Sequence, residues 1–182
     1  LHLCDQHLSH MKADKINTKH NLLLEVLLAA KYEGQSLVKK YNEYKERHNV
    51  FPSDICTALA RSFADIGDII RGKDLYRGNK QEKDRLQNKL KEYFEKIYNN
   101  LNDPQVQSHY KNDDDPNFYQ LREDWWALNR ETVWKAMICK APGNAQYFRN
   151  TCSNGEKPTG EKCQCIDGTV PTNLDYVPQY LR

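Results

Sequence analysis

The sequence has no long apolar run and almost no excess of charge of either sign. Its longest apolar stretch, Leu22 to Ala30, is interrupted by Glu25 and is far shorter than the ~20 residues of a membrane-spanning helix. The 182 residues include 27 Lys and Arg against 25 Asp and Glu, a net charge of +2, which excludes a protein that coats DNA through a large basic excess. No basic-then-apolar leader is present, and a start at Leu1 indicates a piece of a longer protein.

Motifs of catalysis are also absent. The sequence contains no phosphate-binding glycine-rich loop, no nucleophile elbow and no zinc-binding His-Glu helix. Carboxylates and arginines do alternate with apolar residues on two predicted helices, namely Asp65, Asp68, Glu123, Asp124 and Glu131 with Arg61, Arg71, Arg122 and Arg130. Without a nucleophile beside them, we favour partly buried ion pairs over acid–base chemistry. A metal site built from these carboxylates is a weaker alternative, because no Glu-x-x-His spacing accompanies them. We therefore predict no enzyme, no catalytic or metal-binding residue and no cofactor.

Four segments carry the apolar period of an amphipathic helix. They cover approximately residues 18–48, 53–71, 80–101 and 116–140. Four such segments must bury their apolar stripes against one another, so the predicted fold is all-α, a bundle of long helices. Residues 1–17 are too poor in apolar side chains to form a unit and are interpreted as the tail of a preceding subdomain.

Local residues set the expected helix boundaries. Ser53 is the predicted N-cap of the second helix and Gly72 its end. Asp103-Pro104 is expected to end the third helix, and Pro116 is placed in the first turn of the fourth. Gly34, in the middle of the first helix, allows a bend or a break there.

The fourth segment contains two adjacent tryptophans. The predicted apolar stripe passes through Trp125 and Leu128, so Trp126 points about 100° away from it. This makes Trp125 a core residue and Trp126 the better candidate for an interface.

The cysteines are unevenly distributed. Of Cys4, Cys56, Cys139, Cys152, Cys163 and Cys165, four lie in the irregular loop 140–169 or at its start, before an extended exit over 170–182. Zinc is disfavoured because Cys163 and Cys165 are separated by one residue and no histidine lies nearby. We predict disulfides and hence an oxidising, extracellular setting. Cys56 is expected to bond to the loop through Cys163 or Cys165, and Cys4 to have its partner in a missing upstream segment.

Basic residues concentrate on the third predicted helix. A patch there could attract a sulfated glycan or an acidic protein surface, although an ordinary solvated helix face explains the same residues. The candidate ligand-binding residues, chosen on charge alone, are Lys80, Lys83, Arg85, Lys89 and Lys91.

Three segments resemble a known family. Residues 60–72 read ARSFADIGDIIRG; residues 121–126 read LREDWW and continue through Asn129-Arg130 and Val133-Trp134 to Cys139; residues 171–182 read PTNLDYVPQYLR. These motifs resemble Duffy-binding-like domains, in particular the alpha class of the malaria-parasite erythrocyte membrane protein 1 family. The matched piece is identified as a fragment centred on the helix-bundle second subdomain.

The resemblance implies a function. Proteins of this family are variant surface antigens, displayed as the extracellular part of a membrane protein on the infected red cell. Their domains bind host receptors or heparan sulfate-like glycans and thereby cause cytoadherence or rosetting, a virulence trait in malaria. We therefore predict a host-receptor-binding adhesion module, with no nucleic-acid partner and no insertion of this segment into a membrane. The alternative is a purely structural scaffold that supports binding sites elsewhere in the full domain.

Overall fold

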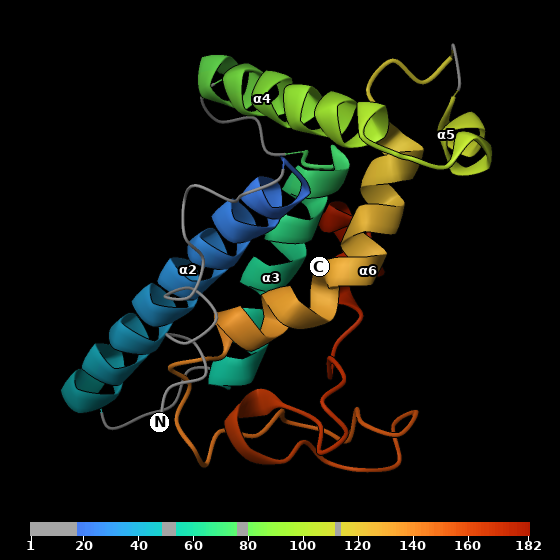
Figure 1. Ribbon diagram of the computed structural model, residues 1–182. Helices are drawn as coiled ribbons and strands as arrows, with labels where there is room; N and C mark the ends of the chain where they lie inside the picture. The colour runs from blue at the N-terminus through green and yellow to red at the C-terminus, as the bar shows by residue number, and fades with distance from the viewer. Residues whose placement is uncertain (1–17, 49–53, 76–79, 112–113) are drawn as a thin grey trace.

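The computed structural model describes residues 18–48, 54–75, 80–111 and 114–182; the described residues up to 137 are mostly helical, and those from 138 onwards are mostly irregular (Figure 1). The helices are α2 (Thr18–His48), α3 (Ile55–Arg71), α4 (Lys80–Asn99), α5 (Pro104–Tyr110) and α6 (Tyr119–Met137), followed by three short 3-10 turns, η2 (Glu161–Cys163), η3 (Leu174–Tyr176) and η4 (Gln179–Leu181). Within these ranges no strand is formed. The predicted all-α fold is therefore confirmed.

The core lies where α2, α3 and α6 pack against one another, with α4 crossing one end of the bundle (Figure 1). On α3, apolar side chains at three- and four-residue steps are buried, as expected for an amphipathic helix. Phe63 is central, because its ring centroid lies 5.2 Å from those of both Trp126 and Trp134. The aromatic side chains of α6 therefore fix how α3 and α6 pack.

Glycines allow two close approaches between helices. A Cβ at Gly34 of α2 would lie 1.9 Å from the backbone oxygen of Met137, and a Cβ at Gly67 of α3 would lie 2.8 Å from the Trp126 ring. The helix α2 runs unbroken through Gly34. The glycine therefore provides the space for α2 to cross the end of α6 rather than the break that its sequence position allows.

The observed helix boundaries differ in part from the expected ones. The helix α3 begins at Ile55 with Asp54 as N-cap, whose carboxylate accepts the Cys56 N–H at 3.0 Å; the expected N-cap, Ser53, lies outside the described residues. At its other end, Gly72 adopts the left-handed conformation with φ 72°, as the sequence predicts.

The region after α4 differs more strongly from the boundaries that the sequence predicts. The helix α4 ends at Asn99 rather than 101, and residues 104–110 form α5, which the sequence analysis missed. Asp103 caps α5 by accepting the Gln105 N–H at 2.8 Å, and Pro104 occupies its first turn. The same Asp-Pro pair that was expected only to end a helix therefore also starts one.

The helix α6 is shorter than predicted and presents another face to the core. It spans 119–137 rather than 116–140, so Pro116 precedes it. The assignment of the tryptophans is wrong. Trp126 is completely buried, Trp125 is half-buried with its ring edge-on to Phe94, and Leu128 is 82% exposed. Because apolar residues occur all round α6, the sequence pattern alone did not determine which side faces α3.

The C-terminal residues cover the bundle. Residues 140–169 form the irregular loop that the sequence predicts, interrupted by one 3-10 turn. The exit over 170–182 is less extended than expected, because it contains the turns η3 and η4. Of these, η3 packs against α3.

Candidate functional site

The predicted basic residues on α4 do not form one surface. Since successive helical residues are about 100° apart, Arg85 lies on the side away from the buried Leu90, Lys89 lies on one flank, and Lys80 and Lys91 lie on the opposite flank. Lys83 is half-buried and donates to the backbone carbonyl of Asp74. The structure thus divides the candidate patch into two small rows, and one member faces inward.

Carboxylates accompany the outer row. Arg85 and Lys89 line a groove together with two acidic and two amide side chains, those of Asp84, Glu92, Gln81 and Asn88. Lys89 also pairs with Glu25 of α2, at 3.4 Å. The positive charge of this face is therefore largely balanced by neighbouring carboxylates. Its electrostatic attraction for a polyanion is weaker than the number of basic residues on α4 indicates.

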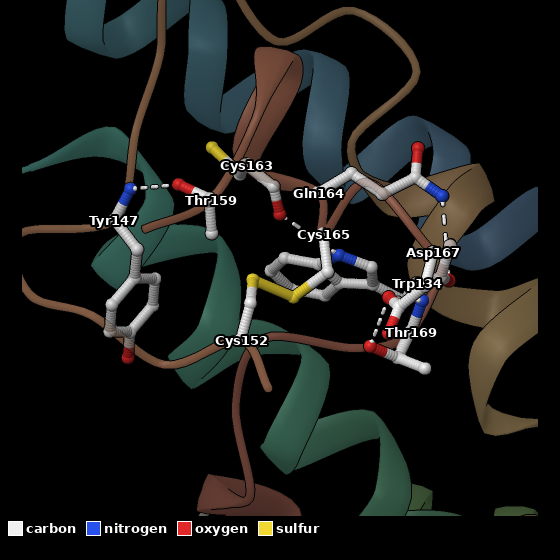
Figure 2. The surroundings of a disulfide bond; sticks show 10 residues. Trp134, Tyr147, Cys152, Thr159, Cys163, Gln164, Cys165, Asp167 and Thr169 are labelled. Carbon is white, nitrogen blue, oxygen red and sulfur yellow. Dashed lines mark hydrogen bonds between the residues drawn. A yellow bond between two sulfur atoms is a disulfide. The ribbon is translucent and has the colours of Figure 1, made fainter. Parts of the chain in front are cut away.

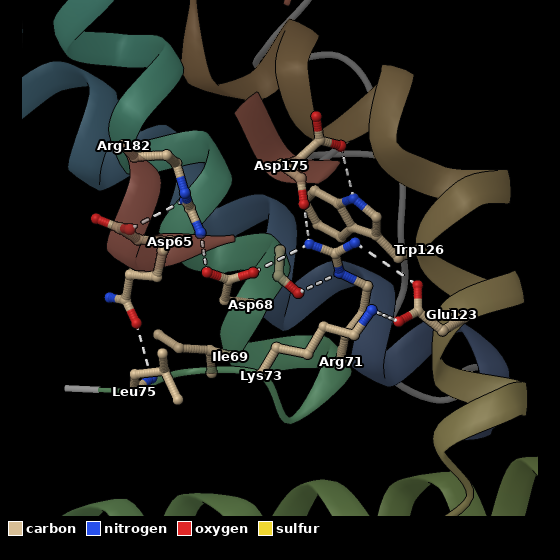
Figure 3. A network of polar contacts seen from close by, with 12 residues as sticks. Asp65, Asp68, Ile69, Arg71, Lys73, Leu75, Glu123, Trp126, Asp175 and Arg182 are labelled. Carbon is tan, nitrogen blue, oxygen red and sulfur yellow. Dashed lines mark hydrogen bonds and ion pairs between the residues drawn. The ribbon is translucent and has the colours of Figure 1, made fainter. Parts of the chain in front are cut away.

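A polar network lies beneath the C-terminal turns (Figure 3). The Asp175 carboxylate, with 0% of its side chain exposed, accepts the Trp126 indole N–H at 2.9 Å and two Arg130 N–H groups at 2.7 and 2.8 Å. The Arg71 guanidinium donates to the backbone carbonyl of Asp175 and, at 3.1 Å, to Asp68. The network therefore joins α3, α6 and the chain exit.

Arg182 extends this network. Its guanidinium donates to Asp68 and, at 3.3 Å, to Asp65. Burial raises the pKa of the Asp68 carboxyl, and the positive charges of Arg182 and Arg71 only partly oppose this shift. The sequence analysis did not single out Asp175 or Arg182 as pairing residues, because each lies more than a hundred positions from its partners on α3.

Arg122 has a separate, capping role. Its guanidinium donates to the Ile70 carbonyl at 2.6 Å and the Ile69 carbonyl at 3.2 Å, at the C-terminal end of α3, and to the Gln87 amide oxygen of α4 at 2.6 Å. Positive charge at a helix C-terminus satisfies the last carbonyls and the helix dipole. Burial lowers the pKa of this arginine from its usual value.

The remaining carboxylates that were considered for catalysis are also paired. Glu123 contacts Lys73 and, at 3.6 Å, Arg71; Asp124 accepts the Tyr110 hydroxyl at 2.8 Å; Glu131 pairs with Lys135 at 2.6 Å. This agrees with the interpretation of the carboxylates as ion pairs of the bundle. In the described part of the chain, no group of three or more His, Cys, Asp or Glu side chains could hold a metal ion.

One disulfide fastens the loop to the bundle, and a second closes the loop on itself (Figure 2). Cys56 of α3 bonds to Cys163, one of the two partners considered for it, and Cys152 bonds to Cys165. Cys139 is disulfide-bonded as well, and Cys4 lies outside the described residues. The Trp134 indole N–H also donates to the Cys163 carbonyl at 3.2 Å, so α3, α6 and the loop meet at this point.

This geometry defines a class of protein: a helical bundle stapled by disulfides and locked by buried arginine–carboxylate pairs. The chain belongs to the Duffy binding domain family, whose model matches residues 1–182. The resemblance that the three motifs indicate is thereby confirmed. No curated protein matches the chain.

Three solved structures illustrate the relationship. The NTS-DBL1(alpha-1) domain of Plasmodium falciparum membrane protein 1 (PfEMP1) from the varO strain is 45% identical, with a TM-score of 0.75 over 98% of this chain and 39% of that one. The varO double domain of NTS-DBL1-alpha and CIDR-gamma is also 45% identical, with a TM-score of 0.74 over 99% and 25%. A DBLb domain of PfEMP1 bound to human ICAM-1 is 36% identical, with a TM-score of 0.63 over 97% and 33%. The chain thus spans well under half the length of these relatives.

Among the helices in the described residues, none combines the length and the apolar character that crossing a bilayer requires.

Proposed function

We propose that this chain is part of a non-enzymatic adhesion domain that binds a host cell-surface receptor. The observation that carries the proposal is its 36% identity, over 97% of its length, to a domain bound to human ICAM-1, together with membership of the same family. By the same reasoning we place it in the extracellular part of a parasite variant surface antigen on the infected red cell, where it would mediate cytoadherence or rosetting. The disulfides fit such an oxidising setting.

The test is a binding experiment on the whole domain. A domain-length protein containing these 182 residues is passed over an array of human cell-surface receptors, ICAM-1 included, and of sulfated glycans. Saturable binding to at least one receptor, retained without divalent metal, is the expected result. A folded domain that binds none of them, and no human endothelial cell or red cell, contradicts the proposal.

A second candidate function is that of a scaffold. It is favoured by the burial of the family motifs, since Phe63, Asp68, Arg71 and Trp126 are all less than 4% exposed and cannot touch a partner. In that case the 182 residues alone would bind nothing that the full domain binds. Equal binding of the fragment and of the domain to the same receptor would reject the scaffold.

For a sulfated glycan partner, we assign the outer row of α4, because Arg85 and Lys89 are exposed and line the same groove. Binding would weaken with salt, since exposed charges are screened within about 8–10 Å at physiological ionic strength. Replacing both by Glu is expected to abolish retention on a heparin column. The matched control replaces Lys80 and Lys91 on the opposite flank by Glu and keeps most of the retention. Equal losses in the two double variants would show a net-charge effect and remove this assignment.

A further inference from the structure

A cleft in the disulfide-stapled loop carries an inference about where a receptor binds. The cleft has a volume of about 660 Å³ and lies between the segments 143–146 and 160–161. It is lined by two glycines and three polar residues, Gly143, Gly160, Asn144, Gln146 and Glu161. None of these residues belongs to the basic rows on α4 or to the buried network, so the cleft is a separate surface.

The polar side chains of the cleft are available to a ligand. Asn144, Gln146 and Glu161 are exposed, and within the described residues their side chains make no hydrogen bond or ion pair. At Gly143 an added Cβ would meet no atom within 4 Å, so the cleft is open above the backbone there. Unpartnered amide and carboxylate groups around an open floor can therefore hydrogen-bond an incoming molecule without first breaking an internal contact.

The cleft is preformed rather than loose. The Cys163 N–H donates to the Ala145 carbonyl at 2.9 Å, and the Tyr147 N–H donates to the Thr159 hydroxyl at 2.8 Å (Figure 2). Cys163 is bonded to Cys56 of α3, which anchors one wall of the cleft to the bundle. A rigid site loses little conformational entropy on binding.

One exposed apolar side chain borders the cleft, and another lies on the segment that follows Gln146. A Cβ at Gly160 would lie 3.4 Å from the Cγ1 atom of Ile166, whose side chain is 93% exposed. Along 145–148, Ala145 and Tyr147 are buried whereas Gln146 and Phe148 are exposed, with Phe148 64% exposed. Apolar anchors beside hydrogen-bonding groups are the usual anatomy of a protein–protein contact.

The chemistry of the lining selects among ligands. An amide side chain carries both a donor and an acceptor and so matches a peptide group. Among the described residues that line the cleft, Glu161 is the only one with a charged side chain, and its carboxylate disfavours a sulfated or phosphorylated ligand. We propose that this cleft binds an extended segment of a protein receptor, with Asn144 and Gln146 on its peptide groups and Ile166 against one of its apolar side chains. The proposal rests on the adhesive function proposed above.

The test uses the domain-length protein and intact human endothelial cells and red cells. Gly143→Trp fills the open floor, and Ile166→Asp removes the apolar anchor at a site where no core contact is lost. Both are expected to weaken cell binding at least tenfold while leaving the circular dichroism and the unfolding temperature of the domain unchanged. Leu128→Asp is the matched control, because Leu128 is 82% exposed on α6, and it should bind as the parent does.

Enzyme treatment of the cells identifies the class of the partner. Trypsin should abolish binding by the parent domain, and heparinase or neuraminidase should leave it intact. Loss of binding with the glycosidases, or parent-like binding by either cleft variant, overturns the proposal while the adhesive function stands. A parent domain that binds neither cell type overturns both.

Discussion

Asp175 carries more buried contacts than any carboxylate discussed above. Its carboxylate accepts hydrogen bonds from Trp126 and Arg130 of α6, and its side chain has no exposed surface. Asp175→Asn removes the charge but keeps the size. Because Arg130, 17% exposed, would then lack its counter-ion, we expect the free energy of unfolding to fall by about 3 kcal/mol. Urea unfolding at pH 7, followed by tryptophan fluorescence, measures this.

An exposed aspartate provides the control for that experiment. Asp84 lies on the surface of α4, so Asp84→Asn makes the same chemical change without a buried partner and should alter stability by less than about 0.5 kcal/mol. If the two substitutions changed the free energy of unfolding equally, the contacts of Asp175 would add nothing to stability beyond the effect of net charge.

At Gly34, packing between helices is expected to reverse the usual stabilising effect of a Gly→Ala substitution. Gly→Ala within a helix ordinarily stabilises by about 0.5–1 kcal/mol. At Gly34 the new Cβ would meet the Met137 backbone oxygen, so α2 and α6 must separate. Gly34→Ala is expected to destabilise by about 1–3 kcal/mol, as measured by thermal unfolding. Gly143→Ala, where nothing lies within 4 Å, should be neutral, and a stabilised Gly34→Ala variant would refute the close approach.

At the level of elements, the sequence predicted correctly those helix boundaries that depend on local residues. Its apolar period located α2 at the observed bounds, and Gly72 marked the end of α3. The missed helix α5 has no buried residue, so it leaves no apolar stripe to detect. The face of α6 was predicted wrongly for the opposite reason: its apolar residues occur on every side, and the contacts of Trp126 with Phe63, Gly67 and Asp175 decide which side is buried.

The candidate sites were less predictable, because they depend on contacts between segments that are far apart in the sequence. The basic residues of α4 are close in sequence, yet the helix turns them onto different sides, and Glu25, which pairs with Lys89, comes from another helix. The cleft around Gly143 and Glu161 joins two loop segments that are held together by hydrogen bonds, from the Cys163 N–H to the Ala145 carbonyl and from the Tyr147 N–H to the Thr159 hydroxyl. No local pattern encodes such a juxtaposition, although the cysteine cluster marks the region in which it occurs.

The contact between α2 and α4 gives a prediction about pH. The Tyr93 hydroxyl donates to Glu25 at 2.6 Å, and this bond raises the pKa of Tyr93 from 10.0 to about 12. Since the folded-state pKa is the higher one, the contact stabilises the fold fully below about pH 10 and is lost as the pH rises towards about 12. Glu25→Gln should therefore move part of the tyrosinate absorbance at 295 nm to lower pH.

The control for this titration is another carboxylate of α2. Glu33 accepts the Ser62 hydroxyl at 2.9 Å and, within the described residues, accepts no hydrogen bond from a tyrosine hydroxyl. Glu33→Gln should leave the absorbance curve unchanged. If both variants titrate as the parent does, Tyr93 does not bond to Glu25 in solution.

At the scale of the whole molecule, the two disulfides whose cysteines both lie in the described residues constrain very different lengths of chain. The Cys56–Cys163 bond spans 107 positions and the Cys152–Cys165 bond spans 13. Both pairs of cysteines are buried, so replacing either pair by alanine removes the same atoms from a similar environment. The comparison of the two double variants therefore isolates the effect of the cross-link on the unfolded chain.

Loop-closure entropy predicts the order of the two effects. A bond closing about 100 residues stabilises by about 4.7 kcal/mol, and one closing about 15 residues by about 3 kcal/mol. Removing Cys56–Cys163 should therefore lower the free energy of unfolding by about 2 kcal/mol more than removing Cys152–Cys165, as measured by urea denaturation under non-reducing conditions. If the short bond proves the more important one, the fold depends mainly on order within the loop, and the attachment of the loop to α3 does not dominate stability.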